Sequence, residues 1–197
     1  KETDENFWRI YGLGQRGVNT AAVFPNWQSA DAIPERAKLV AYGCDWGFTN
    51  DPTAIVSVWR EDYSLYIEEH IYKTGMTNRD ISEELDKLEL ERTPIICDSA
   101  EPKSIEELHR LGHNVKPSKK GPDSIRLGID IMKRHKLYIL KDSLNAQKEF
   151  RNYRWEVDRN GTQLSKPVDK SNHIIDAVRY VCINRIGTAY TGKYFIS

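Results

Sequence analysis

The sequence predicts an α/β domain whose central sheet is mixed and holds five or more strands. Segments 39–45, 53–60 and 64–73 have β-like patterns and follow one another with short turns, as in an antiparallel meander. Amphipathic helices and short apolar strands then alternate, which indicates βα units that add parallel strands beside the first strand. Residues 153–165 alternate around an Asn-Gly pair, which predicts an added β-hairpin.

The helices that flank this sheet are predicted from apolar spacing and from their end signals. Thr77 or Asn78 is a suitable N-cap for the first helix, Pro94 stops it, and Pro102 opens the next one. The last helix is apolar on nearly all sides and therefore belongs in the core. The predicted helices cover residues 77–91, 102–111, 123–135, 143–152 and 172–186. Short strands are expected between them at 95–98, 114–116 and 137–140.

Charge is balanced over the whole chain but not along it. Lys plus Arg number 29 and Asp plus Glu number 29, so the chain has no overall field that attracts nucleic acid or anionic membrane. Segment 116–141 holds eight basic residues and two acids, whereas acids dominate segment 77–108. This asymmetry predicts one basic face turned toward an anionic partner.

Cysteine usage and hydropathy indicate the compartment. Cys44, Cys97 and Cys182 stand in apolar runs without metal-binding spacing, which predicts buried free thiols in a reducing cytoplasm. No apolar run approaches the roughly 20 residues that span a bilayer, and no signal peptide is visible, so a soluble intracellular protein without a membrane partner is expected.

The leader 1–36 differs from the rest of the chain because it is rich in glycine and aromatic residues and lacks periodicity. It is predicted to be a connector that packs against the domain. The chain begins with Lys1, so we expect residues 37–197 to be a domain excised from a longer polypeptide.

Acidic residues occur at points where a buried carboxylate requires a partner. Asp45 ends the first strand, Asp98 ends the fourth, and His173 and Asp176 lie three residues apart on one face of the last helix. If the first and fourth strands are neighbours and the helix packs over them, three carboxylates converge, and their mutual repulsion implies a bound cation. Oxygen ligands favour Mg²⁺ or Mn²⁺, and a nearby imidazole favours tolerance of Mn²⁺. The alternatives are that Asp45 caps the turn at 46–51 and that His173 caps its helix.

Short motifs carry a resemblance to a known family. Tyr-Gly-Cys-Asp-Trp-Gly-Phe at 42–48, Cys-Asp-Ser-Ala-Glu-Pro at 97–102 and His-Ile-Ile-Asp-Ala-Val-Arg-Tyr at 173–180 resemble the C-terminal nuclease domain of tailed-bacteriophage terminase large subunits. The leader resembles the linker that joins ATPase and nuclease in that family. The resemblance implies an RNase H-like (RuvC-like) fold and an endonuclease that cuts double-stranded viral DNA concatemers with two divalent ions, Mg²⁺ or Mn²⁺. It also implies that Asp45, Asp98 and Asp176 are catalytic metal ligands, with His173 as a fourth site residue.

Partners follow from the same resemblance. It implies an N-terminal ATPase domain on the same polypeptide, a terminase small subunit, a portal protein and work on the procapsid in the host cytoplasm. Contacts to DNA phosphates with little sequence preference are expected from basic residues of a turn and of the hairpin region, namely Lys119, Lys120, Arg154, Lys166 and Lys170.

Other functions fit parts of the sequence. A Holliday-junction resolvase or a transposase of the same fold would use similar acids, because the fold alone does not determine the substrate. A non-catalytic docking module of the packaging motor would keep the fold without the chemistry. Residues 45–49 also fit the phosphate loop of actin-like ATPases, which would need a second such loop and a second domain.

Overall fold

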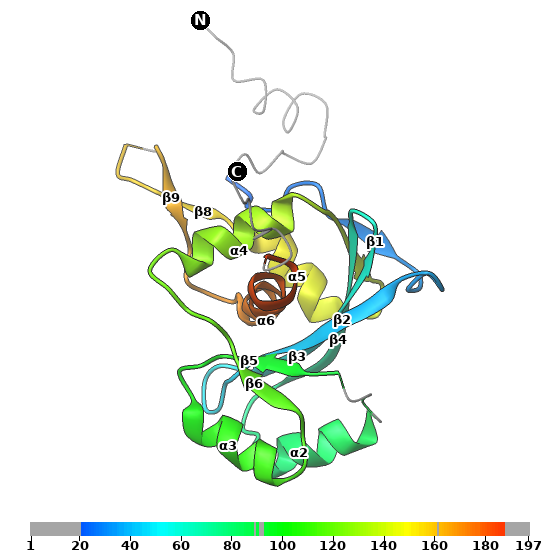
Figure 1. Cartoon of the computed structure of the whole chain (residues 1–197). Helices are drawn as coiled ribbons and strands as arrows, with labels where there is room; N and C mark the ends of the chain where they lie inside the picture. Colours follow the sequence, from blue (N-terminus) through cyan, green and yellow to red (C-terminus); the bar gives the residue numbers. More distant parts are fainter. Residues whose placement is uncertain (1–20, 89, 91–92, 161, 188–197) are drawn as a thin grey trace, which may run out of the picture.

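The computed structural model describes residues 21–88, 90, 93–160 and 162–187. Within these residues one seven-stranded sheet has the order β1-β7-β4-β3-β2-β5-β6, and β8 and β9 form a separate hairpin (Figure 1). The strands of the main sheet are β1 (Gln28–Ala30), β2 (Lys38–Asp45), β3 (Thr53–Glu61), β4 (Ser64–Lys73), β5 (Ile95–Cys97), β6 (Val115–Pro117) and β7 (Lys136–Leu140). The hairpin strands are β8 (Trp155–Val157) and β9 (Gln163–Pro167).

The helices lie close to the predicted positions. They are α2 (Asn78–Lys87), α3 (Pro102–Arg110), α4 (Ser124–Lys133), α5 (Leu144–Asn152) and α6 (His173–Val181), which a π-helical turn, η2 (Cys182–Ile186), continues. Of the two N-caps that the sequence suggests, Thr77 is the one that caps α2, and it forms a capping box with Asp80. The α2 helix ends at Lys87, short of the predicted end at residue 91. No helix in the described ranges is long and apolar enough to cross a membrane.

The sheet joins an antiparallel meander to parallel strands, as predicted. Strands β2, β3 and β4 pair antiparallel. Strand β5 lies parallel to β2, with Cys44 opposite Cys97, and β6 is parallel to β5. Strand β7 differs from the expectation that all parallel strands lie beside β2, because it pairs with β4. Between β6 and β7 the chain forms α4, which crosses over one face of the sheet (Figure 1). Strands β4, β3, β2 and β5 therefore lie between β7 and β6 in the sheet.

Part of the predicted leader belongs to the sheet. Strand β1 pairs in parallel with β7, and the side chains of Val23 and Phe24 are buried in the core. Sequence reasoning missed β1 because Gln28-Ser29-Ala30 is a short, mostly exposed edge strand without an apolar pattern. Residues 1–20, the remainder of the leader, lie outside the described residues. The extent of a linker at 1–36 stays a prediction.

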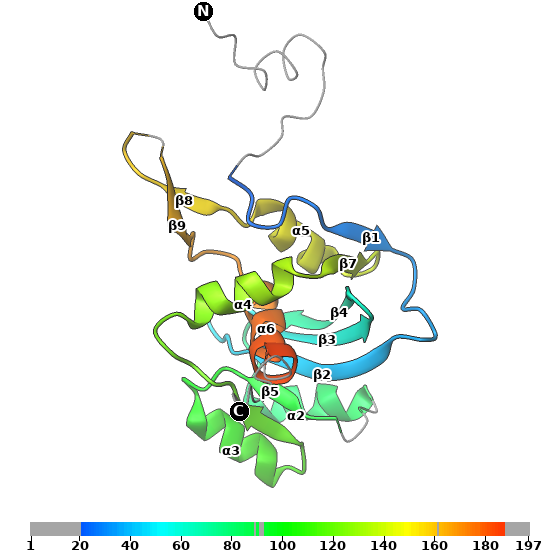
Figure 2. The same cartoon turned by 45° about the horizontal axis from the view of Figure 1, so that its top comes forward.

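Helices cover both faces of the sheet. Helices α4, α5 and α6 lie on one face, and α2 and α3 lie on the other (Figures 1 and 2). Each face of the sheet has its own hydrophobic core. Because side chains alternate along β2, Ala41 belongs to the core beneath α4, α5 and α6, whereas Tyr42 and Cys44 belong to the other core with Ile81 and Leu85 of α2. The three cysteines predicted as buried free thiols are free and buried.

A close approach of backbone to backbone sets the position of α6 over β2. A Cβ atom at Gly43 would overlap the carbonyl oxygen of Ala177 on α6. Because glycine has no side chain, α6 can lie directly on the end of β2. This contact places the first turn of α6, with His173 and Asp176, beside Asp45.

Candidate active site

The first two acids lie at the same end of adjacent strands. Asp45 is the last residue of β2, and Asp98 follows Cys97, the last residue of β5. The backbone N–H of Asp98 donates to the carbonyl oxygen of Cys44 at 3.1 Å, so the parallel pairing continues up to the two acids. The predicted neighbourhood of these strands is therefore confirmed. Both carboxylate oxygens of Asp45 contact side chains of α6, His173 and Tyr180, rather than the following turn. That turn is held by Thr53, whose hydroxyl donates to the carbonyl oxygen of Gly47 at 2.8 Å.

His173 joins Asp45 directly. Its Nδ1 atom lies 3.0 Å from Asp45 Oδ2, and its Nε2 atom lies 3.5 Å from Asp51 Oδ1. The hydrogen bond to Asp45 raises the pKa of His173, although burial works in the other direction. Burial raises the pKa of Asp45, and the charges of Asp176 and Asp98 add to this effect, whereas the contact with His173 opposes it. The imidazole thus favours its protonated form while it faces these carboxylates.

Tyr180 connects the two strand-end acids. Its hydroxyl lies 3.2 Å from Asp45 Oδ1 and 3.2 Å from Asp98 Oδ2, and it can donate to either carboxylate. The ring is buried, and burial together with the nearby carboxylates raises the pKa of the phenol far above its ordinary value. Tyr180 therefore stays a neutral donor. Sequence reasoning missed it, although its position four residues after Asp176 places both on one face of α6.

Asp98 has a lysine partner. Lys120 Nζ forms an ion pair with Asp98 Oδ1, which also accepts a hydrogen bond from the backbone N–H of Ala100 at 2.8 Å. Burial works to raise the pKa of Asp98, but the hydrogen bonds from Lys120, Ala100 and Tyr180, together with the charge of Lys120, lower the pKa below its ordinary value. The sequence suggested Lys120 as a phosphate contact, and the structure places it among the acids.

Asp176 has an arginine partner. Arg179 Nε lies 3.1 Å from Asp176 Oδ1, and the guanidinium lies 4.8 Å from the centroid of the Tyr180 ring. Burial raises the pKa of Asp176, and Arg179 opposes this shift. The Arg179 side chain passes over Gly128 of α4, where an added Cβ would overlap its Cγ atom. Asp45 thus faces an imidazole, Asp98 a lysine ammonium and Asp176 an arginine guanidinium.

A buried carboxylate fixes the start of α6. Glu149 of α5 accepts hydrogen bonds from the backbone N–H groups of Ile174 and Ile175 at 2.8 and 3.2 Å. The hydroxyl of Tyr72 donates to the other oxygen of Glu149 at 2.9 Å. A carboxylate at a helix N-terminus satisfies unpaired N–H groups and suits the helix dipole. Glu149, which sequence reasoning missed, therefore holds the turn that carries His173 and Asp176.

The donor set fits a hard divalent cation. Carboxylate oxygens with one imidazole suit Mg²⁺ or Mn²⁺. As the side chains stand, however, no three His, Cys, Asp or Glu side chains within the described part of the chain are close enough to hold one ion. The reason is visible in the contacts, since Asp98 and Asp176 are turned toward Lys120 and Arg179. The metal-ligand roles of Asp45, Asp98, Asp176 and His173 stay predictions.

The predicted DNA contacts fall into two groups. Lys119 and Lys120 lie in the loop between β6 and α4, and Lys170 shares with His173 a pocket of about 510 Å³. Arg154 and Lys166 belong to the hairpin region, where Lys166 Nζ lies 3.3 Å from Glu156 Oε1. The hairpin extends past α4, away from the sheet (Figure 2). The DNA-binding roles stay predictions.

The basic segment 116–141 does not form one face. Lys116 lies on β6 at one edge of the sheet. Lys141 forms an ion pair with Asp31 just beyond β1 at the opposite edge, and Lys133 Nζ lies 4.9 Å from the centroid of the Trp155 ring. The prediction of a single basic face is therefore wrong, because the fold separates residues that are close in sequence.

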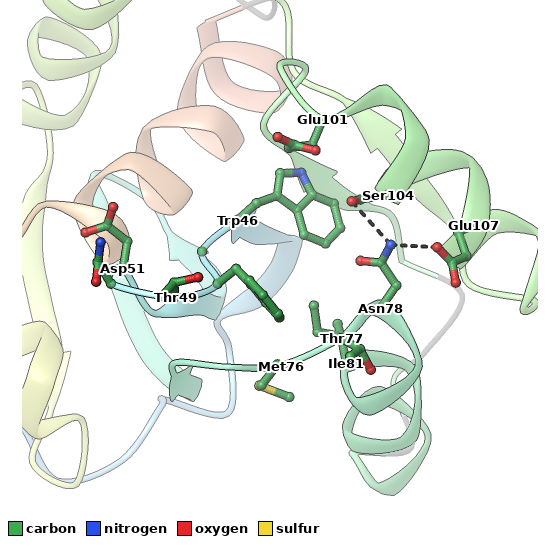
Figure 3. Close-up of a pocket in the computed structure, with 13 residues that line it drawn as sticks. Trp46, Thr49, Asp51, Met76, Thr77, Asn78, Ile81, Glu101, Ser104 and Glu107 are labelled. Atoms are coloured by element: carbon green, nitrogen blue, oxygen red, sulfur yellow. Dashed lines mark hydrogen bonds between the residues drawn. The ribbon is translucent and has the colours of Figure 1, made fainter.

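A pocket of about 670 Å³ is lined by residues that follow Asp45 and Asp98 closely in the chain, among them Trp46 and Glu101 (Figure 3). Trp46 forms part of its wall and donates from Nε1 to the backbone oxygen of Asp98 at 3.0 Å. Met76 and Ile81 add apolar surface, and Glu101 and Glu107 add negative charge. A lining with these two carboxylates does not attract a phosphate backbone.

Comparisons with known proteins agree with this geometry. A family model described as "Terminase RNAseH like domain" matches residues 45–182. The large terminase subunit of Bacillus phage SPP1 is 30% identical over 194 residues, which is 91% of this chain and 45% of that protein. The PBSX phage terminase large subunit of Bacillus subtilis (strain 168) is 28% identical over 91% of this chain and 44% of its own length. The chain spans less than half the length of these relatives.

Solved structures match the fold. The nuclease domain of the large terminase from bacteriophage SPP1, solved with bound Mn, superposes with a TM-score of 0.70 at 28% identity, covering 80% of this chain and 96% of that one. The large terminase nuclease from thermophilic phage G20c, solved with bound magnesium, has a TM-score of 0.61 at 15% identity, covering 84% and 98%. The second match shows the fold alone. The predicted RNase H-like fold is confirmed, and the chain belongs to the terminase RNase H-like domain family.

Proposed function

We propose that this domain is a divalent-metal-dependent endonuclease that cuts double-stranded viral DNA concatemers during genome packaging. The observation that carries the proposal is the meeting of Asp45 and Asp98, from adjacent strand ends, with His173 and Asp176 on the helix that crosses them. The family match and the metal-bound nuclease domains among its structural neighbours support it.

Asp45, Asp98 and Asp176, with His173 beside them, would hold two ions, Mg²⁺ or Mn²⁺. Such ions supply an activated water and stabilise the leaving oxygen of the phosphodiester. His173, oriented by Asp45 and Asp51, can accept or donate a proton at Nε2. Tyr180 keeps Asp45 and Asp98 side by side as a neutral donor. Glu149 holds the first turn of α6.

Basic side chains would bind DNA phosphates without reading bases. Lys119 and Lys120, in the loop before α4, and Lys170, in the pocket with His173, would contact phosphates near the acids. Arg154 and Lys166 would extend the contact onto the hairpin region. The remaining partners proposed are an N-terminal ATPase domain on the same polypeptide, a terminase small subunit and a portal protein, in the host cytoplasm. The SPP1 and PBSX relatives are large subunits more than twice as long as this chain, which is consistent with a further domain.

Nicking of supercoiled plasmid by the purified chain tests the proposal. We expect cleavage in Mn²⁺ or Mg²⁺, none in EDTA, and loss of cleavage in Asp45→Asn, Asp98→Asn and Asp176→Asn. Asp62→Asn, at an exposed turn between β3 and β4, is the matched control and should cleave normally. A folded wild-type chain that neither cleaves nor binds metal would favour the docking module instead.

A resolvase or transposase of the same fold is the second candidate. The family match favours the packaging nuclease. Equal rates on linear duplexes of unrelated sequence are expected of it, whereas strong preference for a four-way junction over a duplex would favour the resolvase.

A further inference from the structure

Lys120 occupies a position inside the candidate site that a peripheral DNA-binding lysine would not need. Its ammonium forms an ion pair with Asp98 Oδ1 and lies 5.8 Å from the centroid of the Tyr180 ring. The same ring carries the hydroxyl that reaches Asp45 and Asp98. Lys120 thus supplies positive charge at the point where the two strand-end acids meet.

The loop that carries Lys120 is anchored from both sides. Ser118 extends the pairing of β6 with β5, because its backbone N–H donates to the carbonyl oxygen of Cys97 at 2.7 Å. Asn184 of η2 holds the other side of the loop. Its Oδ1 accepts from the backbone N–H of Lys119 at 3.0 Å, and its Nδ2 donates to Ser118 Oγ at 3.0 Å. Asn184 belongs to η2, and such π-helical turns often occur at functional sites. The placement of Lys120 beside Asp98 therefore follows from the fold.

The lysine side chain can leave this position. It is 39% exposed, whereas the Asp98 side chain is 18% exposed. A lysine has a flexible four-carbon stem and a strongly hydrated head, so it exchanges partners readily. An ammonium and a divalent ion at the same Asp98 oxygen would repel each other, so they compete for it.

We propose that Lys120 is an exchangeable counter-ion of Asp98, which neutralises this carboxylate until a divalent ion binds and then turns toward a DNA phosphate. The proposal rests on the proposed function, because it takes Asp98 as a metal ligand. It assigns to Lys120 a positioning role that Lys119, its neighbour on the loop, does not share. Lys119 is exposed and is not ion-paired with any acid among the described residues.

Calorimetric titration with Mn²⁺ in the absence of DNA tests this exchange. The Lys120→Met variant lacks the ammonium that competes with the metal ion, so its Kd for Mn²⁺ should be lower than that of wild type. Because exposed ion pairs are weak, we expect a decrease of about two- to fivefold. Lys119→Met, the matched control, should keep the wild-type Kd. Plasmid cleavage by Lys120→Met should nevertheless be slower than that of wild type. A purely structural lysine would give the opposite result, with lower thermal stability and weaker metal binding.

Unchanged or weaker Mn²⁺ binding by folded Lys120→Met overturns the exchange. If that variant does not fold, Asn184→Ala carries the same test, since it releases the loop while keeping the lysine, and it too must bind Mn²⁺ more tightly. Failure of the proposed function looks different, because the wild-type chain would then bind no Mn²⁺ and cleave no plasmid.

Discussion

Removal of the Asp176 carboxylate is expected to destabilise the metal-free domain. Repulsion among three bare carboxylates would predict the opposite, since loss of one charge would relieve the other two. The ion pair with Arg179 determines whether the stability falls or rises. The Arg179 side chain is only 4% exposed, and Asp176 lies 3.1 Å from its Nε atom, so Asp176→Ala leaves a buried guanidinium without its carboxylate.

The magnitude follows from the burial of the pair. Breaking a buried ion pair by removing one partner costs about 3–5 kcal/mol. The Asp176 side chain keeps 19% of its surface exposed, and water can therefore replace part of the lost interaction, so we expect about 2–3 kcal/mol. Each kcal/mol lowers Tm by about 2–4 °C in a domain of this size, which gives a drop of about 4–12 °C.

Urea unfolding in EDTA, followed by tryptophan fluorescence, measures this loss. Asp98→Ala is the matched control, because its partner Lys120 is 39% exposed, and the free energy of unfolding should change by less than about 1 kcal/mol. Arg179→Met in the Asp176→Ala background should restore most of the stability, since it removes the unpaired charge. If Asp176→Ala is as stable as wild type, the buried ion pair between Asp176 and Arg179 does not stabilise the metal-free domain.

Further predictions concern His173, the basic residues and one glycine. His173→Ala should reduce plasmid cleavage without abolishing it, with a larger loss in Mn²⁺ than in Mg²⁺, because imidazole suits Mn²⁺ better; equal losses in both metals would contradict this. Because the pKa of His173 is raised, its contact with Asp45 should stabilise the metal-free fold fully below the ordinary pKa of about 6.5 and lose that effect as the pH rises through the raised value. The difference in unfolding free energy between wild type and His173→Asn should therefore shrink with rising pH, and a constant difference would refute the assignment. Lys119→Ala should weaken DNA binding about equally on unrelated duplexes and reduce the salt dependence measured by fluorescence anisotropy; a loss confined to one sequence would count against phosphate contact. Gly128→Ala should lower the free energy of unfolding by about 1–3 kcal/mol, because its Cβ would overlap the buried Arg179 side chain, and an unchanged urea midpoint would show that Arg179 can move aside.

Many elements of the fold were predictable because their signals are local. The meander, an N-cap at Thr77 or Asn78, the helices of the βα units and the hairpin each depend on a pattern within a few residues. Strand β1 was not predictable in this way, because Gln28-Ser29-Ala30 on an edge has no apolar periodicity and is ordered by pairing with β7. The position of β7 beside β4 likewise depends on where α4 crosses the sheet.

The charge pattern of segment 116–141 led to one wrong prediction. A run of bases in one segment suggested one basic face, yet β6 and β7 lie on opposite sides of the meander. Lys141 therefore pairs with Asp31, and Lys120 reaches the acids. Charge density along a chain predicts a face only when the whole segment stays on one element.

Sequence patterns were enough to predict which acids end strands, that His173 and Asp176 share a helix face, and that strands β2 and β5 are neighbours. These properties depend on periodicity and on the rules of chain connection, which act over short distances or through topology. Which group each acid faces could be seen only in the folded chain. Lys120, Arg179 and the Tyr180 hydroxyl reach their carboxylates through long side chains whose directions are set by packing. Gly43 and Gly128 make room for that packing, and a glycine in a sequence does not reveal which atoms will fill the space beside it.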